Sequence, residues 1–264
     1  MDAPGGRVLL DDTAPRTRTS REDTMTETWI NRPLLGFDTE TTGVDVAGDR
    51  IVTAALVLRT PGVGTEVRTW LLDPGVEIPQ EAAAIHGIST EHARAHGVRP
   101  LEALEEIAAE LATHLADGVP VVAYNAAFDL SLLDSELLRH GLKTLPQRLG
   151  HPVEPVVDPL VIDRWLDRYR QGKRRLGDLS QWYGVTSDGD LHTAEVDVLA
   201  TLDVLEALTR RFPQLARMSL ADLHQQQIGA HRQWAVSFNE WRREQGLDGP
   251  GASGRWPVQY SAGV

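Results

Sequence analysis

The hydrophobic pattern of this chain predicts a β-sheet in its first two thirds. Five short apolar runs, rich in valine, isoleucine and leucine, have the length of buried strands and end at turn-forming residues. The turn sequence PGVG at 61–64 joins the second run to the third, and so short a connection favours antiparallel pairing. The predicted strands are 34–39, 50–58, 66–72, 119–124 and 153–157.

Amphipathic segments with a helical period predict helices over most of the remaining chain. Three successive strands followed by strand–helix units predict an α/β fold, in which helices flank a mixed five-stranded sheet. The predicted helices are 80–85, 89–95, 100–116, 127–140, 159–170, 176–183, 193–211 and about 219–244.

The two ends of the chain lack this regularity. Residues 1–30 mix glycine, proline, threonine and charged residues without sustained periodicity, which predicts a flexible N-terminal tail. The alternating pattern occupies 31–211 and predicts one main domain, followed by a C-terminal helical extension at 212–245. Glycine, serine and proline are frequent in 246–264, which predicts a second flexible tail.

Composition restricts the classes of function. The chain has no cysteine, which excludes disulfides, thiolate zinc sites and cysteine nucleophiles. We expect a cytoplasmic protein without membrane contacts, because no apolar stretch approaches the ~18 to 20 residues that span a bilayer and the N-terminus lacks a secretory signal pattern. The net charge of -12 argues against coating nucleic acid through bulk positive charge. A nucleic-acid partner must therefore be held locally, by a basic patch, metal ions or base contacts.

The first candidate site is the acid pair Asp38 and Glu40, at the end of an apolar run in LLGFDTETTG. Residues two apart on a strand point to the same face, so these two carboxylates would lie side by side. Burying like charges together is unfavourable unless a cation compensates them. Taken alone, the pair is consistent with a metal site or with an ordinary acidic turn.

A second candidate, Asp129, lies in the first turn of a predicted helix in YNAAFDLSLLDSELL. It sits at the edge of a leucine stripe, where either a functional acid or an acid favoured by the helix dipole would fit. Asn125, just before this helix, is a candidate helix cap or substrate contact.

A third candidate, Asp197, lies on the apolar face of the predicted helix 193–211. It is about 120° or more away from the arc that holds the other charged residues of this helix. Those residues are Glu195, Asp203, Glu206 and Arg210. A buried acid needs a metal ion or an arginine partner, and both remain open. His192, five residues earlier, could take a proton from an attacking water near neutral pH.

Four acids without cysteine suit hard divalent cations such as Mg2+ or Mn2+, which bind carboxylate and water oxygens. Two such ions, ~3.5 to 4 Å apart, would lower the pKa of a bound water and stabilise the departing oxygen of a phosphodiester. We therefore expect two divalent metal ions as the cofactors.

Three motifs in this order, FDTETTG, NAAFD and HTAEVD, resemble the exonuclease motifs of the DEDDh group. That group includes the DnaQ-like, polymerase epsilon-subunit type proofreading exonucleases, RNase T and oligoribonuclease. The segments IPQEAAAIHGIS and RRLGDLSQWYGV also match, so the resemblance covers about residues 33–210. It implies a ribonuclease H-like fold for 31–211 and 3′-to-5′ exonuclease activity that releases nucleoside 5′-monophosphates.

The resemblance also implies roles for individual residues. It assigns metal ligation to Asp38, Glu40, Asp129 and Asp197, with His192 as the general base. It implies that Thr41, His86 and Phe128 lie beside the terminal nucleotide. Asn125 joins these substrate-binding candidates because of its place just before the helix that holds Asp129.

The expected substrate is the 3′ end of single-stranded DNA, in proofreading or repair, and a DNA polymerase is a candidate partner. A 3′-to-5′ exoribonuclease or oligoribonuclease, an internal nuclease, and a non-catalytic nucleic-acid-binding module attached to a polymerase are the alternatives.

Two further clusters have two interpretations each. Six basic residues crowd 164–175, where they would either contact phosphates or form a solvated face balanced by Asp163 and Asp167. The aromatic residues of the last predicted helix are expected to pack against the protein, with base stacking as the alternative. They are Trp234, Phe238 and Trp241.

Overall fold

The computed structural model describes residues 28–186 and 192–259. Most of the predicted N-terminal tail therefore lies outside the described residues. The folded part begins earlier than 31, however, because Trp29 is buried and its indole nitrogen donates a 3.0 Å hydrogen bond to the carbonyl oxygen of Leu215. None of the helices within the described ranges combines the length and apolar character needed to cross a lipid bilayer.

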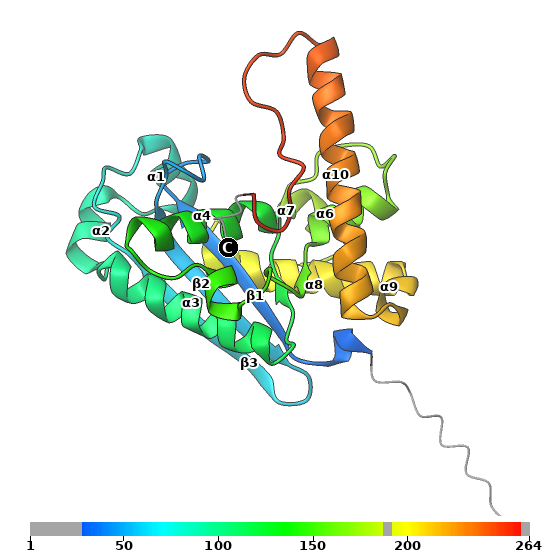
Figure 1. The fold of residues 1–264 in the computed structure, drawn as a ribbon, viewed down its shortest axis with the longest axis horizontal. Coiled ribbons are helices and arrows are strands. Elements are labelled where there is room, and N and C mark those ends of the chain that lie inside the picture. Colours follow the sequence, from blue (N-terminus) through cyan, green and yellow to red (C-terminus); the bar gives the residue numbers. More distant parts are fainter. Residues whose placement is uncertain (1–27, 187–191, 260–264) are drawn as a thin grey trace, which may run out of the picture.

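A five-stranded sheet in the order β3-β2-β1-β4-β5 forms the centre of the protein (Figure 1). β1, β2 and β3 pair in antiparallel fashion, whereas β4 and β5 run parallel to β1. This confirms the predicted mixed sheet. The strands are Leu34–Thr41 (β1), Ile51–Thr60 (β2), Gly64–Leu71 (β3), Val121–Val122 (β4) and Val156–Val157 (β5).

β4 and β5 are shorter than the apolar runs that predicted them. Pro120 and Pro155 stand directly before the two strands and have no amide hydrogen to donate to a neighbouring strand. Their carbonyl oxygens still accept hydrogen bonds, from Leu35 and Val121 respectively. The hydrogen-bonded pairing is therefore limited to two residues in each strand.

Ten helices of the described part surround this sheet, and eight of them match predicted segments to within a few residues. The two short helices α5 and α9 were not predicted. The helices are Gln80–His86 (α1), Thr90–His96 (α2), Pro100–Ala116 (α3), Ala126–Arg139 (α4), Leu145–Leu149 (α5), Pro159–Leu166 (α6), Leu176–Tyr183 (α7), Ala194–Arg211 (α8), Gln214–Arg217 (α9) and Leu220–Glu244 (α10).

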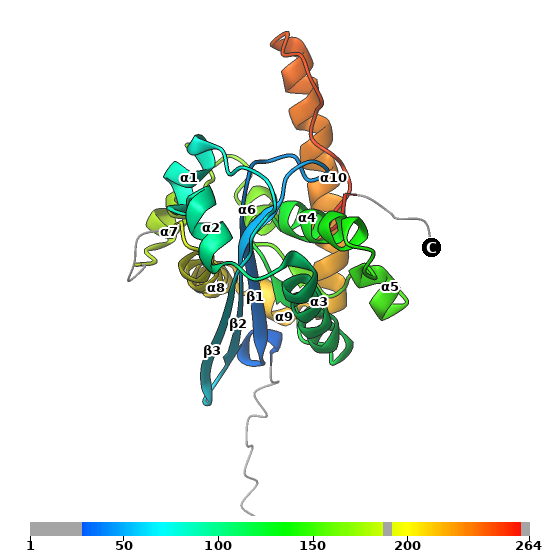
Figure 2. The ribbon, with the colours of Figure 1, turned by 90° about the vertical axis from the view of Figure 1, so that its left-hand side faces the viewer.

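Helices cover both faces of the sheet, which Figure 2 shows nearly edge-on with α3 and α4 on one side and α8 on the other. The strand alternation of β1 explains the two layers. Leu35 and Phe37 pack in the cluster that includes α3 and α4, while Leu34 packs in the cluster that includes α8. The carboxyl ends of β1, β4 and β5 meet at one edge of the sheet, because these strands are parallel.

The long helix α10 begins against β5 and then projects beyond the body of the protein (Figure 1). Gln227 anchors the first half of α10 to β5. Its side-chain nitrogen donates a 3.0 Å hydrogen bond to the carbonyl oxygen of Val156, and its side-chain oxygen accepts a 2.7 Å hydrogen bond from the backbone amide of Asp158.

The described residues after α10 differ from the predicted flexible tail. They return along the helix to the main domain, where Trp256 is buried and its indole donates to Asp158 at 3.3 Å. The amide of Gln259 donates to the hydroxyl of Ser131 at 2.8 Å. Further bonds join Asn239 on α10 to Ala252. Composition did not reveal this packing, because it depends on contacts with residues distant in the sequence.

Candidate active site

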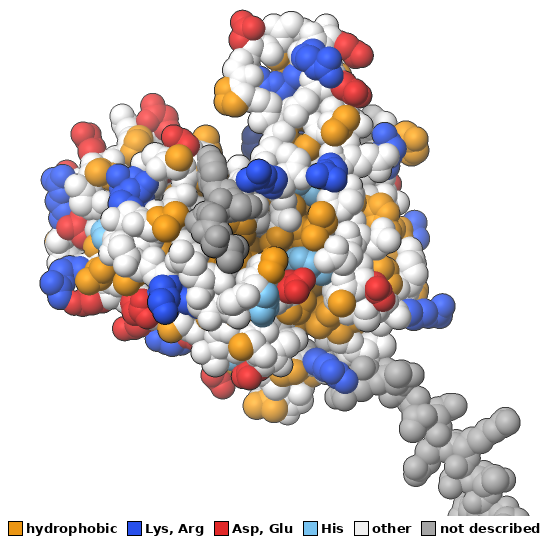
Figure 3. All heavy atoms as spheres, in the orientation of Figure 1, with side chains coloured by type: hydrophobic (Ala, Val, Ile, Leu, Met, Phe, Trp, Pro, Cys, Tyr) orange, Lys and Arg blue, Asp and Glu red, His pale blue; other side chains and the backbone are white. Residues whose placement is uncertain are grey.

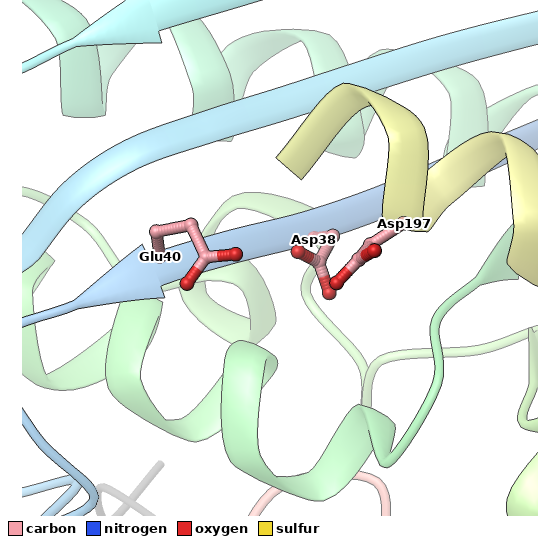
Figure 4. A group of neighbouring side chains, drawn as sticks. All are labelled: Asp38, Glu40 and Asp197. Atoms are coloured by element: carbon pink, nitrogen blue, oxygen red, sulfur yellow. The ribbon is translucent and has the colours of Figure 1, made fainter. Parts of the chain in front are cut away.

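The carboxylates of Asp38, Glu40 and Asp197 meet near the carboxyl end of β1. One oxygen of each lies within 4.8 Å of the others, which is close enough for a shared metal ion. Asp38 and Glu40 are two residues apart on β1 and project to the same face, as their spacing predicted. Asp197 reaches them from the first turn of α8. In Figure 4, the carboxylates of Asp38 and Asp197 point toward each other, with Glu40 farther along the strand.

Gly36 allows α8 to lie this close to β1. A Cβ atom at Gly36 would collide with Cγ1 of Val198 and would lie 3.3 Å from Cδ1 of Leu202. Because Val198 directly follows Asp197, the missing side chain at Gly36 sets how closely Asp197 approaches Asp38.

Asp129 lies next to this group but is held separately. It is buried in the first turn of α4, and its Oδ1 accepts a 2.7 Å hydrogen bond from the hydroxyl of Thr39 and a 3.1 Å bond from the amide of Thr39. Thr39 lies between Asp38 and Glu40 in the sequence and projects to the opposite face of the strand. Sequence reasoning overlooked Thr39, although its position between two candidate ligands was visible.

Burial raises the pKa of Glu40 to about 7. It also raises the pKa of Asp129 to about 7, even though the hydrogen bonds from Thr39 act in the opposite direction. The pKa of Asp38 lies well above its usual range, first because of burial and then because of the neighbouring charges of Asp129, Asp197 and Glu40. Burial raises the pKa of Asp197 as well.

This charge distribution fits a bound cation. Among the described residues, no ion pair with arginine or lysine reaches any of the four acids. The arginine partner that could have explained a buried Asp197 is therefore not seen in this part of the chain. Close, buried carboxylates without a positive neighbour are stabilised when a divalent ion binds them.

His192 lies just before α8, and its backbone amide donates a 3.2 Å hydrogen bond to Oδ1 of Asp197. Its φ of 103° is uncommon for a residue other than glycine. The side chain is exposed. The structure thus brings the predicted histidine and the predicted acid into contact, through the backbone of His192.

Two of the predicted substrate contacts line one cleft beside Glu40. This cleft has a volume of about 270 Å³, and Thr41 and His86 both face it, together with residues that start α1 and follow β1. His86 is buried, and its Nδ1 accepts a 3.2 Å hydrogen bond from the amide of Ile88. Burial lowers the pKa of His86, which favours its neutral form. The cleft therefore offers a neutral ring and a threonine beside the acidic cluster.

The other two predicted contacts do not line this cleft: Asn125 directly precedes α4, and Phe128 lies in its first turn. Asn125 is exposed and adopts a left-handed conformation with φ of 61°, and its side chain does not cap the helix. Phe128 is half-buried against the core. Their predicted contacts with substrate stay predictions.

Asp158 fixes the turn at Asn125 and was missed by sequence reasoning. Its carboxylate is 1% exposed and accepts from the amides of Asn125 at 3.1 Å and Ala126 at 3.0 Å. It also caps α6 through the amides of Leu160 and Val161. Its position between an apolar run and a proline was a visible sign of a helix cap, but the link to α4 was not.

Part of the basic cluster at 164–175 is used internally. Asp163 is fully buried and forms ion pairs with Arg170 and Arg174. This contact confirms the balancing role considered for Asp163. Arg168, Lys173 and Arg175 remain exposed and are the members of the cluster that can reach a phosphate.

The four acids and His192 all lie within the part of the chain that matches a known protein family. The family model described as exonuclease, RNase T type, matches residues 35–205. A DNA polymerase III subunit epsilon-like protein of Rhodobacter capsulatus is 32% identical over 204 residues, which are 75% of this chain and 26% of that protein. A PolC-type DNA polymerase III of Lacticaseibacillus paracasei is 27% identical over 194 residues, which are 74% of this chain and 12% of that protein.

Among solved structures, exonuclease I from Methylocaldum szegediense superposes with a TM-score of 0.57 at 25% identity. The match covers 70% of this chain and 42% of that one. The sheet order and this likeness together confirm the expected ribonuclease H-like fold. The chain spans less than half the length of each of these three proteins.

Proposed function

The chain belongs to the DEDDh, DnaQ-like exonuclease family, and from this premise we propose that it is a metal-dependent 3′-to-5′ exonuclease acting on single-stranded DNA. It hydrolyses the terminal phosphodiester bond and releases nucleoside 5′-monophosphates. The observation that carries this proposal is the group of three carboxylates, from two elements, whose oxygens lie within 4.8 Å of one another.

In this proposal Asp38, Glu40 and Asp197 hold the metal, and Asp129 completes the set from α4. Two divalent ions, Mg2+ or Mn2+, would supply an acidified water and charge stabilisation for the leaving oxygen when bound. Thr39 holds Asp129 in place through two hydrogen bonds. The protein would thus contribute four carboxylates, of which Asp129 is held by Thr39 and Asp197 by the amide of His192.

His192 acts as the general base in this proposal. It lies at the start of α8 in contact with Asp197, and the exposed imidazole can accept a proton from water and pass it to solvent. Thr41 and His86 hold the terminal nucleotide in the cleft beside Glu40, with Asn125 and Phe128 as further contacts.

The experiment uses one single-stranded DNA oligomer labelled at the 3′ end and another labelled at the 5′ end. Each is incubated with the protein in Mg2+, in Mn2+ and in EDTA. Release of the 3′ label as a mononucleotide, together with a shortening ladder from the 5′-labelled strand, is the expected result. EDTA and Asp129→Ala should abolish both, and a 5′ label released first would overturn the proposed polarity.

RNA is the second candidate substrate, because the matching family model takes its name from RNase T. Matched DNA and RNA oligomers of one sequence distinguish the two. We expect a higher kcat/KM on DNA, because both curated relatives carry names of DNA polymerase components. The same names support a polymerase as partner, in proofreading, and co-purification with the polymerase of the source organism would test it.

A further inference from the structure

Four side chains form a continuous stack on α10 and α6. The guanidinium carbon of Arg164 lies 3.7 Å from the ring centroid of Trp234. Trp234 and Phe238 stack at 5.3 Å with their planes 16° apart, and Phe238 and Trp241 stack at 5.8 Å and 27°. We call these four residues, Arg164, Trp234, Phe238 and Trp241, the aromatic ladder.

The ladder is closed at one end and open at the other. Arg164 covers Trp234, whereas Trp241 is 48% exposed and its ring contact within the described part of the chain is with Phe238. Trp241 therefore departs from the expectation that these rings would pack against the protein. It lies on the half of α10 that projects beyond the body of the protein (Figure 1). A flat apolar ring held in this way offers a free surface for another ring.

Positive charge surrounds the ladder in a protein that is strongly negative overall. The segments 163–175 and 231–245, which carry or adjoin the ladder, hold nine basic and four acidic residues, against a net charge of -12 for the chain. Figure 3 shows basic side chains along α10 and beside it. Arg170 and Arg174 are paired with Asp163, and the other basic residues of these segments are available as counter-charges for the phosphates of a single strand.

The ladder is also connected to the proposed active site. The hydroxyl of Tyr124 donates a 2.7 Å hydrogen bond to the carbonyl oxygen of Arg174, and Asn125 follows Tyr124 at the start of α4. The charges of Asp158 and Arg164 both act on Tyr124. Asp158 joins the start of α4 to the start of α6, and Arg164 on α6 lies against Trp234, so the ladder adjoins the helix whose partner α4 carries Asp129.

We propose that the aromatic ladder binds single-stranded nucleic acid by stacking a base on Trp241, upstream of the nucleotide that occupies the active site. This rests on the proposed nuclease function and names where the rest of the strand lies. Bases stack on aromatic side chains regardless of sequence, which suits an enzyme that removes every nucleotide in turn. Apart from Arg170 and Arg174, the arginines of the segments 163–175 and 231–245 bind the phosphates of the strand.

Binding is measured without turnover. The full chain, in EDTA, is titrated into a 5′-fluorescein oligothymidylate of about 20 nucleotides, and the anisotropy gives Kd. We expect Trp241→Ala to raise Kd about tenfold, because loss of one base–aromatic stack weakens binding by roughly that factor. Trp241→Phe keeps a ring and should lie near wild type.

Val236→Ala is the matched control, since Val236 is also exposed on α10, at 53%, but projects from another side of the helix. It should leave Kd unchanged. A trinucleotide, which lacks the upstream bases of the long oligomer, should bind wild type and Trp241→Ala equally. Thermal unfolding of each variant establishes that the fold is intact.

Equal Kd values for wild type and Trp241→Ala on the long oligomer would overturn the proposal, as would failure of the wild type to bind it. A change in molecular mass by light scattering, with Kd unaltered, would instead assign the ladder to contacts between copies of this chain. Hydrolysis is assayed separately in Mg2+. Tight binding that depends on Trp241, without hydrolysis, would refute the proposed nuclease function and leave this inference standing.

Discussion

The hydroxyl of Thr39 donates a 2.7 Å hydrogen bond to Oδ1 of Asp129, and this contact joins β1 to α4 at the acidic cluster. The two faces of this part of β1 make different contacts. Asp38 and Glu40 approach Asp197 on α8 from one face, while Thr39 bonds to Asp129 from the other. The relative position of the two helices across the site depends on this short stretch of β1.

Replacing Thr39 with valine should lower kcat while the protein stays folded. The change keeps the volume but removes the hydroxyl donor, and a hydrogen bond to a charged group contributes about 1.5 to 3 kcal/mol. We expect a fall in kcat of about tenfold or more on a DNA oligomer. Thr39→Ser, which keeps the donor, is the control. Equal rates for the valine and serine variants would show that the hydroxyl does not position Asp129.

Replacing Asp38 with asparagine should abolish nuclease activity and stabilise the metal-free protein. The substitution removes a carboxylate whose pKa lies well above its usual range, first because of burial and then because of the neighbouring acids, so the metal-free protein no longer bears the cost of that charge. The thermal midpoint in EDTA should rise by a few degrees. Mg2+ should raise the midpoint of the wild type but not that of the variant. A lower midpoint for Asp38→Asn in EDTA would refute the account of charge repulsion.

The stability of the metal-free protein should fall as pH rises from about 5 to 8. Burial raises the pKa of Glu40 and of Asp129 to about 7, so between their unfolded pKa values, about 4, and pH 7 the folded state binds more protons than the unfolded state. The free energy of unfolding therefore decreases with rising pH. Saturating Mg2+ should flatten this dependence, because the metal replaces those protons.

Three buried histidines act in the opposite direction in the lower part of that pH range. Burial lowers the pKa of His86, of His224 and of His231, so they oppose folding once the pH falls below about 6.5, the usual histidine value. Denaturant titrations in EDTA at several pH values measure the slope. A free energy of unfolding that rises from pH 7 to 8 without metal would contradict the prediction.

Replacing Asp158 with asparagine should destabilise the protein by about 2 to 4 kcal/mol, because the amide group places a donor where backbone amides and an indole now donate. Asparagine keeps one acceptor oxygen, so the protein would lose either the bonds from Asn125 and the α6 amides or those from Ala126 and the Trp256 indole. Trp256→Phe removes only the 3.3 Å indole bond and should cost about 1 kcal/mol. Urea unfolding checks both, and equal losses would mean that Asp158 contributes only through Trp256.

Adding a methyl group at Gly36 should separate α8 from β1. The new Cβ would collide with Val198, whose branched side chain cannot turn aside freely, and overpacking of this kind costs about 1 to 3 kcal/mol. Metal affinity should fall in parallel, because Asp197 moves with α8. The double variant with Val198→Ala should recover part of both losses. Calorimetric Mg2+ titration together with unfolding measures them.

Local patterns were enough to predict most elements and the acids. The helix at 176–183 has the predicted bounds, and the two-residue spacing of Asp38 and Glu40 placed both on one face. The angular position of Asp197 on its helix also indicated an acid facing inward, and the residue is half-buried beside Asp38. These inferences succeed because each depends on periodicity within a single element.

The features that the sequence did not predict depend on contacts between elements that are distant along the chain. The bond from Thr39 to Asp129 and the bonds from Asp158 to the start of α4 leave no trace in local periodicity. The same holds for the segment after α10, where contacts of Trp256, Gln259 and Ala252 with distant residues hold a stretch whose composition predicts flexibility. Helices α5 and α9, of five and four residues, are too short for a periodic pattern to emerge.

The acidic cluster draws on β1 near the start of the fold and on α8 near its end. During synthesis, Asp38 leaves the ribosome well before Asp197, and for the seconds in between the group of three acids is incomplete. A chain that ends before α8 lacks Asp197, so the proposed metal site cannot form in partly made or truncated copies.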